Sequence, residues 1–271
     1  MIPKVNLHTH TTFCDGKDSV EAMVQVAIEK GFTALGFSGH SFTAFDQEYC
    51  MTIAGTEQYL AEIARVKALY EGRLAIYAGI EQDFYATYGT EQFEYALGSV
   101  HYVKKAGIYY PVDENPEEFQ RGVREGFGGD VYAYTKAYYD TIAQFPKTHR
   151  VDFIGHFDLL EKFNADHRYF DPQDKRYWYE AHGAIEALIA NDLPFEINTG
   201  GIYRGYCKEP YPSAMLLKEI LRQGGRVMIS SDSHNQGSLD FYFKEAQQLA
   251  RDVGFRSVAI WTPKGWEEAA L

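Results

Sequence analysis

The chain has 271 residues, of which 45% are hydrophobic and 15% aromatic. This is enough apolar material for one large core, and α/β barrels of this length commonly form a single domain. The formal net charge of −12 repels phosphate backbones and argues against general nucleic-acid binding. A small phosphorylated substrate is still compatible with this charge, because bound metal cations can reverse the local field.

Three features of the sequence bear on where the protein works. Cys14, Cys50 and Cys207 are widely spaced, odd in number and without a C-x-x-C pair, which is typical of reduced thiols. The N-terminal Met-Ile-Pro-Lys runs into a strand without a signal-peptide pattern, and no apolar run approaches membrane-spanning length. We therefore expect a soluble cytoplasmic protein with no membrane partner, either a monomer or a homo-oligomer.

Short apolar runs alternate with longer amphipathic runs along the chain. The expected strands are Val5–Leu7, Ala34–Ser38, Leu74–Ile80, Tyr95–Val100, Val151–Gly155, Pro194–Ile197, Arg226–Ser230 and Ser257–Trp261. The expected helices are Ser19–Lys30, Thr56–Tyr70, about Asp130–Gln144, Pro172–Ala190, Ser213–Gln223 and Leu239–Asp252. This alternation predicts an α/β fold with a parallel sheet. With seven or eight units, we expect a closed or distorted (β/α) barrel, with an open doubly wound sheet as the alternative.

One segment, from Tyr102 to about Gly129, breaks the alternation. It is longer than a usual strand-to-helix loop and is rich in glycine, proline and tyrosine. Such a loop in a compact domain is often a lid or a binding loop. Its tyrosines, including Tyr109 and Tyr110, either pack the loop down, form a subunit contact or touch the substrate, and the sequence leaves these roles open.

Ionisable residues follow the expected strands at their C-terminal ends. Six of the nine histidines and three carboxylates share this placement: His8, His10, Asp15, His40, Glu81, His101, His156, Asp232 and His234. Because the strands are parallel, these ends meet on one face, where barrel active sites are built. His149, His167 and His182 do not follow strand ends; His182 is expected to be a packing or surface residue, and a substrate role for His167 is only weakly suggested.

A lone histidine at a strand end is more often structural than a ligand. Nine ionisable groups in one barrel mouth, however, would be costly to bury without a counter-charge, and divalent metal ions supply that charge. Residues i and i+2 of an extended segment point the same way, so His8 and His10 can bind one ion and Asp232 and His234 offer a second pair. Nine ligands exceed what one ion uses, so we expect at least two ions and favour three. The N/O ligand set without cysteine suits zinc, manganese or iron.

The ordered set of motifs resembles the polymerase-and-histidinol-phosphatase (PHP) superfamily. The matching segments are His8-Thr9-His10 with Asp15, Gly36–His40, Gly79–Glu81, Gly98–His101, Gly155–Asp158, Glu196–Gly200 and Ser231–His234. Within the superfamily, the chain length and the Asn198-Thr199-Gly200 segment followed by Arg204 are similar to the monofunctional histidinol-phosphatases. The resemblance implies a distorted (β/α)7 TIM-like barrel, with residues 1–271 forming a single PHP-type domain.

The resemblance also implies a trinuclear centre. One ion would be bound by His8, His10, Glu81 and Asp232, a second by the bridging Glu81 with His101 and His156, and a third by Asp15, His40 and His234. Some relatives have histidine where Asp15 stands here. The implied reaction is hydrolysis of a small phosphomonoester, foremost L-histidinol phosphate to L-histidinol and phosphate in histidine biosynthesis. A metal-bridging hydroxide, rather than a side chain, would be the nucleophile.

Three further residues are candidates around this centre. Arg204 is expected to hold phosphate oxygens, since guanidinium suits bidentate phosphate contact. Lys162 is a second phosphate candidate, or else a solvated surface lysine. Asp158 follows His156 closely and is expected to orient that imidazole or to carry a proton. The sequence assigns no proton donor for the leaving group.

Other functions are compatible with parts of the pattern. The chain could be another PHP phosphoesterase, acting on nucleotides, phosphotyrosine or oligonucleotide ends. An amidohydrolase can also open with H-x-H, but its binuclear site commonly uses a modified lysine at strand four, where this chain has His101. A non-catalytic metal-binding PHP module would be expected to lack ligands, and none is missing from the set above.

Overall fold

Seven parallel strands form the central sheet of the computed structural model, which describes residues 2–271. In the order in which they pair, they are β1 (Val5–Asn6), β2 (Ala34–Phe37), β3 (Ala75–Asp83), β4 (Tyr95–Ser99), β7 (Phe153–Ile154), β8 (Phe195–Asn198) and β9 (Val227–Ser230). All neighbouring strands pair in parallel. The parallel strand–helix architecture predicted from the sequence is therefore confirmed.

The first and last strands of the sheet come together just beyond their ends. Thr9 and Ser233 form a parallel bridge. The backbone N–H of His10 donates to the carbonyl of Ser233 at 2.8 Å, and the N–H of Ser233 donates to the carbonyl of His8 at 3.1 Å. This contact nearly closes the sheet into the expected distorted (β/α)7 barrel, so the open doubly wound alternative does not apply.

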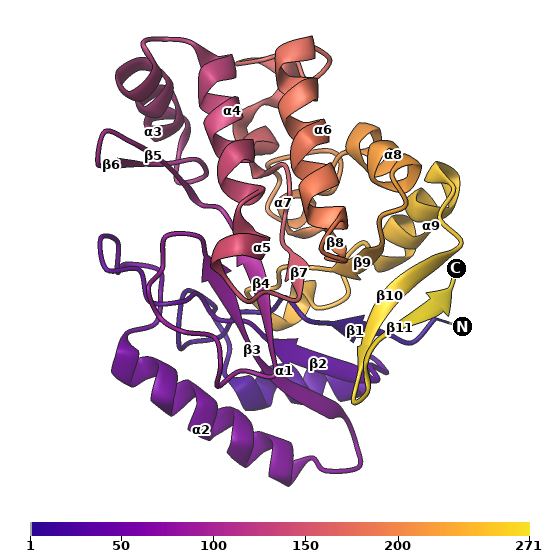
Figure 1. The fold of residues 1–271 in the computed structure, drawn as a ribbon. Coiled ribbons are helices and arrows are strands. Elements are labelled where there is room, and N and C mark those ends of the chain that lie inside the picture. Colours follow the sequence, from indigo (N-terminus) through magenta and orange to yellow (C-terminus); the bar gives the residue numbers. More distant parts are fainter. Residues whose placement is uncertain (1) are drawn as a thin grey trace.

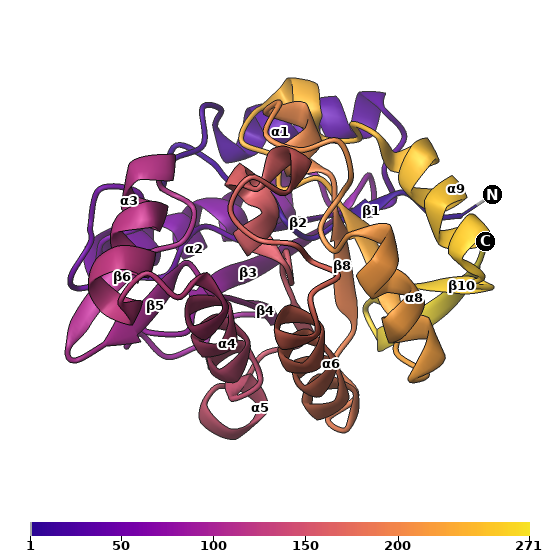
Figure 2. The same ribbon diagram turned by 90° about the horizontal axis from the view of Figure 1, so that it is seen from above.

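Helices surround the barrel, as Figures 1 and 2 show. The six expected helices are all present as α1 (Val20–Glu29), α2 (Ile53–Leu69), α4 (Val131–Ile142), α6 (Lys175–Ile189), α8 (Ala214–Arg222) and α9 (Phe243–Val253). Short helices α3 (Pro116–Arg121), α5 (Phe145–Thr148) and α7 (Gly200–Tyr203) lie between them. Helix α1 illustrates the local signals: the Ser19 side chain accepts from the N–H of Ala22, and Gly31 just past the helix has a φ of 72°, which favours glycine.

Tyr95 of β4 fills the interior of the barrel. Its hydroxyl donates to the carbonyls of Leu7 at 2.5 Å and Phe37 at 3.1 Å. The neighbouring strands accommodate the ring with glycines: a Cβ on Gly79 would lie 2.1 Å from the ring, and a Cβ on Gly36 would lie 2.4 Å from its hydroxyl. The bulk of one tyrosine therefore explains why two facing strand positions lack a side chain.

The eighth expected strand does not join the barrel. Strand β10 (Ser257–Thr262) instead pairs antiparallel with β11 (Gly265–Ala270). Trp261 and Trp266 of this hairpin approach the rings of Tyr95 and Phe153, with centroid distances of 6.3 Å for Tyr95–Trp261 and 5.8 Å for Phe153–Trp266. Because Tyr95 and Phe153 begin their strands, the hairpin covers the N-terminal end of the barrel. The C-terminus lies beside it in Figure 1.

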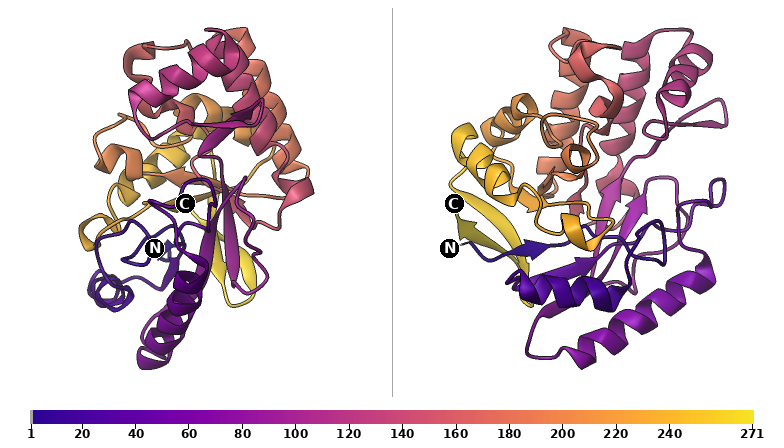
Figure 3. Two further views of the ribbon diagram at one scale, coloured as in Figure 1. Left: turned by 90° about the vertical axis from the view of Figure 1, so that its left-hand side faces the viewer. Right: turned by 180° about the vertical axis from the view of Figure 1, so that it is seen from behind.

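The long segment after β4 has secondary structure of its own. Strands β5 (Tyr102–Lys105) and β6 (Ile108–Pro111) form a hairpin, followed by α3 and a π-turn at Gly122–Gly126. Figure 3 shows this part of the chain from two further sides. Tyr109 stacks on Phe45 at 3.7 Å between ring centroids, and the Tyr102 hydroxyl donates to Asp46 at 2.6 Å. These tyrosines hold the hairpin to the loop that follows β2.

No helix within residues 2–271 is long and apolar enough to cross a membrane. Cys14, Cys50 and Cys207 are all free thiols, as expected from their spacing.

The glycine at position 79 provides a test of the barrel interior. We expect Gly79→Ala to destabilise the protein by about 1–3 kcal/mol, because the added methyl group overlaps the Tyr95 ring. Urea unfolding measures this difference. The matched control is Gly183→Ala on the exposed face of α6, where a Cβ meets no atom within 4 Å, so it should leave stability unchanged or raise it slightly. Equal stability of the two variants would contradict the packing described here.

Candidate metal centre

The Glu81 carboxylate lies at the centre of the C-terminal barrel mouth. Strand β3 carries Glu81 beyond the end of β2, and the backbone of Glu81 pairs with the segment around His40. The side chain is 1% exposed. Five imidazoles contact its two oxygens. Oε2 lies 3.0 Å from His40 Nδ1, 3.3 Å from His8 Nε2 and 3.5 Å from His10 Nε2. Oε1 lies 3.0 Å from His156 Nε2 and 3.4 Å from His101 Nε2. The expected ligands thus converge on one carboxylate.

A first group of ligand atoms consists of His8, His10, Asp232 and Glu81. The Nε2 atoms of His8 and His10 lie 3.5 and 3.3 Å from Asp232 Oδ1, and 3.3 and 3.5 Å from Glu81 Oε2. Zinc–ligand bonds of about 2.0–2.2 Å imply tetrahedral edges of roughly 3.4 Å. The two nitrogens and two oxygens are therefore spaced like the corners of a metal site. Asp232 holds this position with a φ of 47°, a strained conformation for a residue other than glycine.

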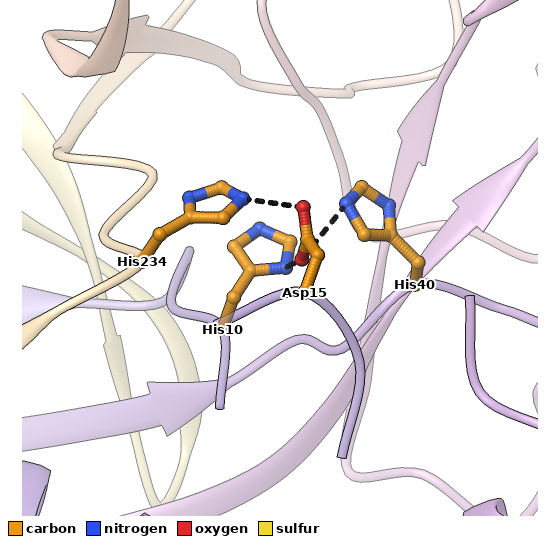
Figure 4. Close-up of side chains that lie close together, drawn as sticks. All are labelled: His10, Asp15, His40 and His234. Carbon is orange, nitrogen blue, oxygen red and sulfur yellow. Dashed lines mark hydrogen bonds and ion pairs between the residues drawn. The ribbon is translucent and has the colours of Figure 1, made fainter. Parts of the chain in front are cut away.

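A second group surrounds Asp15 and is drawn in Figure 4. Asp15 Oδ2 lies 3.0 Å from His234 Nε2, and Asp15 Oδ1 lies 3.6 Å from His40 Nε2 and 3.5 Å from His10 Nδ1. The trio Asp15, His40 and His234 expected from the sequence is thus brought together, with His10 added to it. His10 faces Asp15 with one ring nitrogen and the Glu81–Asp232 pair with the other.

The remaining expected trio, Glu81, His101 and His156, is arranged less simply. Both imidazoles contact the same Glu81 oxygen, but the groups of mutually close ligand atoms are His8–Glu81–His156 and His40–Glu81–His101. All nine expected ligands therefore share one mouth. The geometry alone does not divide them among ions in the way that the family resemblance implies.

Two further carboxylates support the imidazoles and were not singled out as functional from the sequence. Glu196 of β8 accepts from His8 Nδ1 at 2.6 Å and from the backbone N–H of His156 at 2.8 Å. Asp83 accepts from the backbone N–H of His101 at 3.1 Å and lies 3.3 Å from its Nδ1. A carboxylate behind a histidine fixes its tautomer and orientation. The i, i+2 spacing of Glu81 and Asp83, the same as in His8-Thr9-His10, is a signal that could have identified the second.

Asp158 does not orient His156, which was one of the two roles considered from the sequence. Its Oδ2 accepts from the backbone N–H of Ser213 at 2.9 Å, and within residues 2–271 no hydrogen bond joins its carboxylate to His156. Glu196 occupies the supporting position instead. The other role, carrying a proton, stays a prediction.

The charges in the mouth are strongly coupled. Burial and the nearby His234 and His40 lower the pKa of His10 to about 3, so its ring is neutral, as a ligand requires. Burial would raise the pKa of Glu81, but the charges of His40 and His8 keep it well below its usual range. Burial also opposes the charged form of His8, yet Glu196, Asp232 and Glu81 outweigh it and raise that pKa. Metal binding at His8 would therefore displace a proton.

Unpaired buried atoms indicate that the residues fit metal ions. His8 Nε2 and His10 Nε2 are buried, and neither has a hydrogen-bond partner within residues 2–271. Leaving such atoms without a partner is costly, and a divalent cation between them would accept both lone pairs. The donor set of imidazole nitrogens and carboxylate oxygens suits zinc, manganese or iron.

A cavity of about 300 Å³ opens over this centre. Arg204 lines it and donates to Asp232 Oδ2 at 2.7 Å, and its guanidinium lies 3.3 Å from His234 Nδ1. Lys162 also lines it, and its ammonium donates to Asp113 Oδ2 at 2.9 Å. Both expected phosphate-binding cations therefore face the cavity, and Lys162 is not a fully solvated surface residue.

The cavity also has an acidic and aromatic wall. Asp46, Asp113 and Glu114 line it, together with Tyr49, Tyr102, Tyr206 and Tyr211. Burial and neighbouring carboxylates raise the pKa of Glu114, which indicates a negative potential at this wall. Tyr102 packs the loop, as one of the roles considered from the sequence requires, and it also borders the cavity.

The other three histidines lie outside this centre. His182, for example, bonds to Glu219 at 2.6 Å between α6 and α8. None of the three belongs to a group of metal-type ligand atoms within residues 2–271: His149, His167 and His182.

Comparison with known proteins identifies the family. The family model described as "PHP domain" matches residues 6–200. The chain belongs to the PHP domain family. Two relatives align with nearly the whole chain. A "Probable histidinol-phosphatase" of Deinococcus radiodurans is 30% identical, and the alignment covers 93% of this chain and 95% of the relative. The "Histidinol-phosphatase" of Bacillus subtilis is 25% identical, covering 88% of this chain and 96% of its own.

Solved structures share the PHP fold. The HisK protein of Listeria monocytogenes has a TM-score of 0.78 at 22% identity, covering 89% of this chain and 99% of its own. Histidinol phosphate phosphatase from Lactococcus lactis, complexed with Zn, L-histidinol and phosphate, has a TM-score of 0.70 at 20% identity. That match covers 98% of this chain and 100% of the other. These likenesses confirm the barrel architecture.

Glu196 provides a test of how the PHP centre is supported. We expect Glu196→Gln to weaken metal binding by about 10- to 100-fold, because His8 loses the charge that orients it. Competition with a chelator of known affinity measures this change. Glu219→Gln is the matched control, since Glu219 also bonds to a histidine but lies outside the mouth. Unchanged metal affinity in Glu196→Gln would contradict the role of this carboxylate in orienting His8.

Proposed function

We propose that this protein is a metal-dependent phosphatase that hydrolyses L-histidinol phosphate to L-histidinol and phosphate, a step of histidine biosynthesis. The observation that carries the proposal is the charge distribution of the 300 Å³ cavity, whose lining combines metal-type ligands and Arg204 with the carboxylates of an acidic wall. A phosphate group suits the former and a cationic alcohol suits the latter. The histidinol-phosphatase names of relatives that align over most of the chain point to the same substrate.

We further propose that three divalent ions, zinc, manganese or iron, occupy the mouth. Of the nine ligands, His8, His10, Glu81 and Asp232 would hold one ion, Glu81, His101 and His156 a second, and Asp15, His40 and His234 a third. When bound, such ions would supply an acidified water as nucleophile and would neutralise charge on the phosphoryl group. Zinc in the Lactococcus lactis relative supports this class of metal.

The residues of the chain itself position the phosphate. The Arg204 guanidinium already spans Asp232 and His234, so it would hold nonbridging phosphate oxygens directly beside the ligands. Lys162 is anchored by Asp113 and would contribute a second positive charge. Glu196 keeps His8 in the orientation in which Nε2 faces Glu81 and Asp232.

The acidic wall would select the alcohol part of the substrate. L-Histidinol carries an ammonium group and an imidazole, both of which can be cationic. Asp46 and Glu114 supply carboxylates at this wall, whereas Asp113 is already paired with Lys162, and the tyrosine rings beside them offer faces for a cation or an imidazole. A phosphomonoester with an uncharged alcohol part would leave these carboxylates without a cationic partner.

The catalytic unit extends beyond the segment that matches the family model. That match ends at residue 200, whereas Asp232, His234 and strand β9 follow it. Because β9 closes the barrel against the end of β1, the unit needs both parts. We therefore propose that residues 1–271 form a single PHP-type domain.

A phosphatase panel on metal-loaded protein tests the function. We expect kcat/KM for L-histidinol phosphate to exceed that for phenyl phosphate by about 100-fold, because only the former pairs with the acidic wall. Chelation should abolish both activities, and added zinc, manganese or iron should restore them. Comparable rates on nucleotides, phosphotyrosine or phenyl phosphate would contradict the proposed specificity for L-histidinol phosphate. They would still support phosphatase activity. The absence of any phosphoester hydrolysis would favour a non-catalytic metal-binding module.

The number of ions is tested through His101. We expect His101→Ala to bind about two metals per chain instead of three, and kcat to fall by about 100-fold or more, because one ion loses a neutral imidazole ligand. Elemental analysis of the same samples used for kinetics measures both quantities. His182→Ala serves as the control histidine outside the mouth. Full metal content and full rate in His101→Ala would rule out the trinuclear arrangement.

Asp46 tests substrate selection at the acidic wall. We expect Asp46→Asn to raise KM for L-histidinol phosphate by about two- to fivefold, since a partly exposed charge is removed while the acceptor for the Tyr102 hydroxyl remains. KM for phenyl phosphate should stay the same. Asp140→Asn on the surface of α4 is the matched control. If both substrates respond equally, Asp46 does not discriminate between them.

A further inference from the structure

Two of the nine candidate ligands are more exposed than the others. The Asp15 side chain is 34% exposed and the His234 side chain 20%, whereas the other seven are at most 11% exposed. His234 also lacks the support that Glu196 gives to His8, because within residues 2–271 the carboxylates that contact its ring are themselves candidate ligands. We call the group of Asp15, His40 and His234 the rim site. Burial fixes this site less than the rest of the mouth.

The loop that carries Asp15 is folded tightly onto itself. The backbone N–H of Gly16 donates to the carbonyl of Thr11 at 3.1 Å, and the N–H of Thr12 donates to the carbonyl of Asp18 at 3.1 Å. A Cβ on Gly16 would lie 2.4 Å from the backbone nitrogen of Thr11, so the two ends of the loop are in close contact. Asp15 and Asp18 therefore belong to one compact unit, and a force on Asp18 is transmitted to Asp15.

Asp18 joins this loop to the segment that carries His234. Its Oδ2 accepts from the backbone N–H of Gln236 at 2.9 Å, and its Oδ1 accepts from the side-chain amide of Gln236 at 2.8 Å. Beside this pair, the backbone N–H of Lys17 donates to the carbonyl of His234 at 2.8 Å. Hydrogen bonds to an ionised carboxylate are stronger than those between neutral groups. The two bonds of Asp18 thus hold together two segments that come from opposite ends of the chain.

We propose that Asp18 is a positioning residue for the rim site, which keeps Asp15 opposite His234. Asp15 Oδ2 lies 3.0 Å from His234 Nε2, close to the edge of roughly 3.4 Å in a tetrahedral zinc site (Figure 4). Asp18 lines neither the metal-side cavity nor a group of metal-type ligands, so it acts through the loop and does not touch an ion or the substrate. The inference rests on the proposed three-ion centre, in which the rim site holds the third ion.

Metal retention tests this inference. The metal-loaded, full-length protein is equilibrated with zinc buffered by a chelator, and elemental analysis counts the ions at each free zinc concentration. We expect Asp18→Ala to weaken one ion by about tenfold or more and to leave the others unchanged, since losing a contact behind a ligand commonly costs about 10- to 100-fold. Asp18→Asn keeps one acceptor oxygen and should show a smaller loss. Unchanged affinity for every ion in Asp18→Ala would overturn the inference.

Asp240→Ala is the matched control. Asp240 also joins the N-terminal part of the chain to residues that follow β9, through Lys4 at 2.9 Å and Lys30 at 2.6 Å, but it lies outside the mouth. We expect this variant to keep the wild-type affinity for every ion. If it weakens the same ion as Asp18→Ala does, the effect is one of general stability and not of positioning.

A double variant shows which ion depends on Asp18. If Asp18 acts through the rim site, the remaining ions bind equally tightly in Asp15→Ala and in Asp15→Ala/Asp18→Ala, because the ligand that it positions is already gone. A further loss in the double variant would overturn the inference. Gln236→Ala removes one of the two bonds and gives a second reading if Asp18→Ala does not fold. A wild-type count of two ions would contradict the three-ion centre, and the comparison of single and double variants would still decide the role of Asp18.

Discussion

The buried carboxylate of Glu81 is the constraint on which the rest of the site depends. Five imidazoles from four strand ends approach its two oxygens, and several of the atoms involved have no other partner. Such an arrangement is unfavourable in a low-dielectric interior unless cations join it. The mouth is thus built for metal ions. The supporting carboxylates Glu196 and Asp83 fix the rings behind this first layer, so the ligand atoms are positioned before an ion arrives.

The barrel supplies the precision that the site requires. Parallel pairing places the ends of seven strands on one face, and the Thr9–Ser233 bridge brings the first and last of them together. The interior is filled by Tyr95 against two glycine positions, and the β10–β11 hairpin covers the opposite end with Trp261 and Trp266. Ligands that are more than 200 residues apart in the chain, such as His10 and His234, can therefore stack at 4.1 Å between ring centroids.

Two cavities beside the metal centre differ in the charges of the residues that line them. The smaller one joins the ligands and Arg204 to an acidic wall, which suits a molecule that is anionic at one end and cationic at the other. The larger one has carboxylates and no buried counter-cation among the residues that line it, and it shares Tyr206 and Tyr211 with the first. Asp158 belongs to this second space, since its carboxylate bonds to Ser213 and not to His156.

The sequence by itself determined the alternation of strands and helices, the parallel sheet and the nine residues of the mouth. It could do so because strand ends are local features, and because parallel strands bring their C-terminal ends to one face whatever the details of packing. Only the tertiary structure decided which atoms face each other: that His10 faces three carboxylates, that Glu196 rather than Asp158 supports the imidazoles, and that Ser257–Thr262 turns back into a hairpin. These outcomes depend on side-chain direction and on contacts between distant segments, which residue type and spacing do not specify.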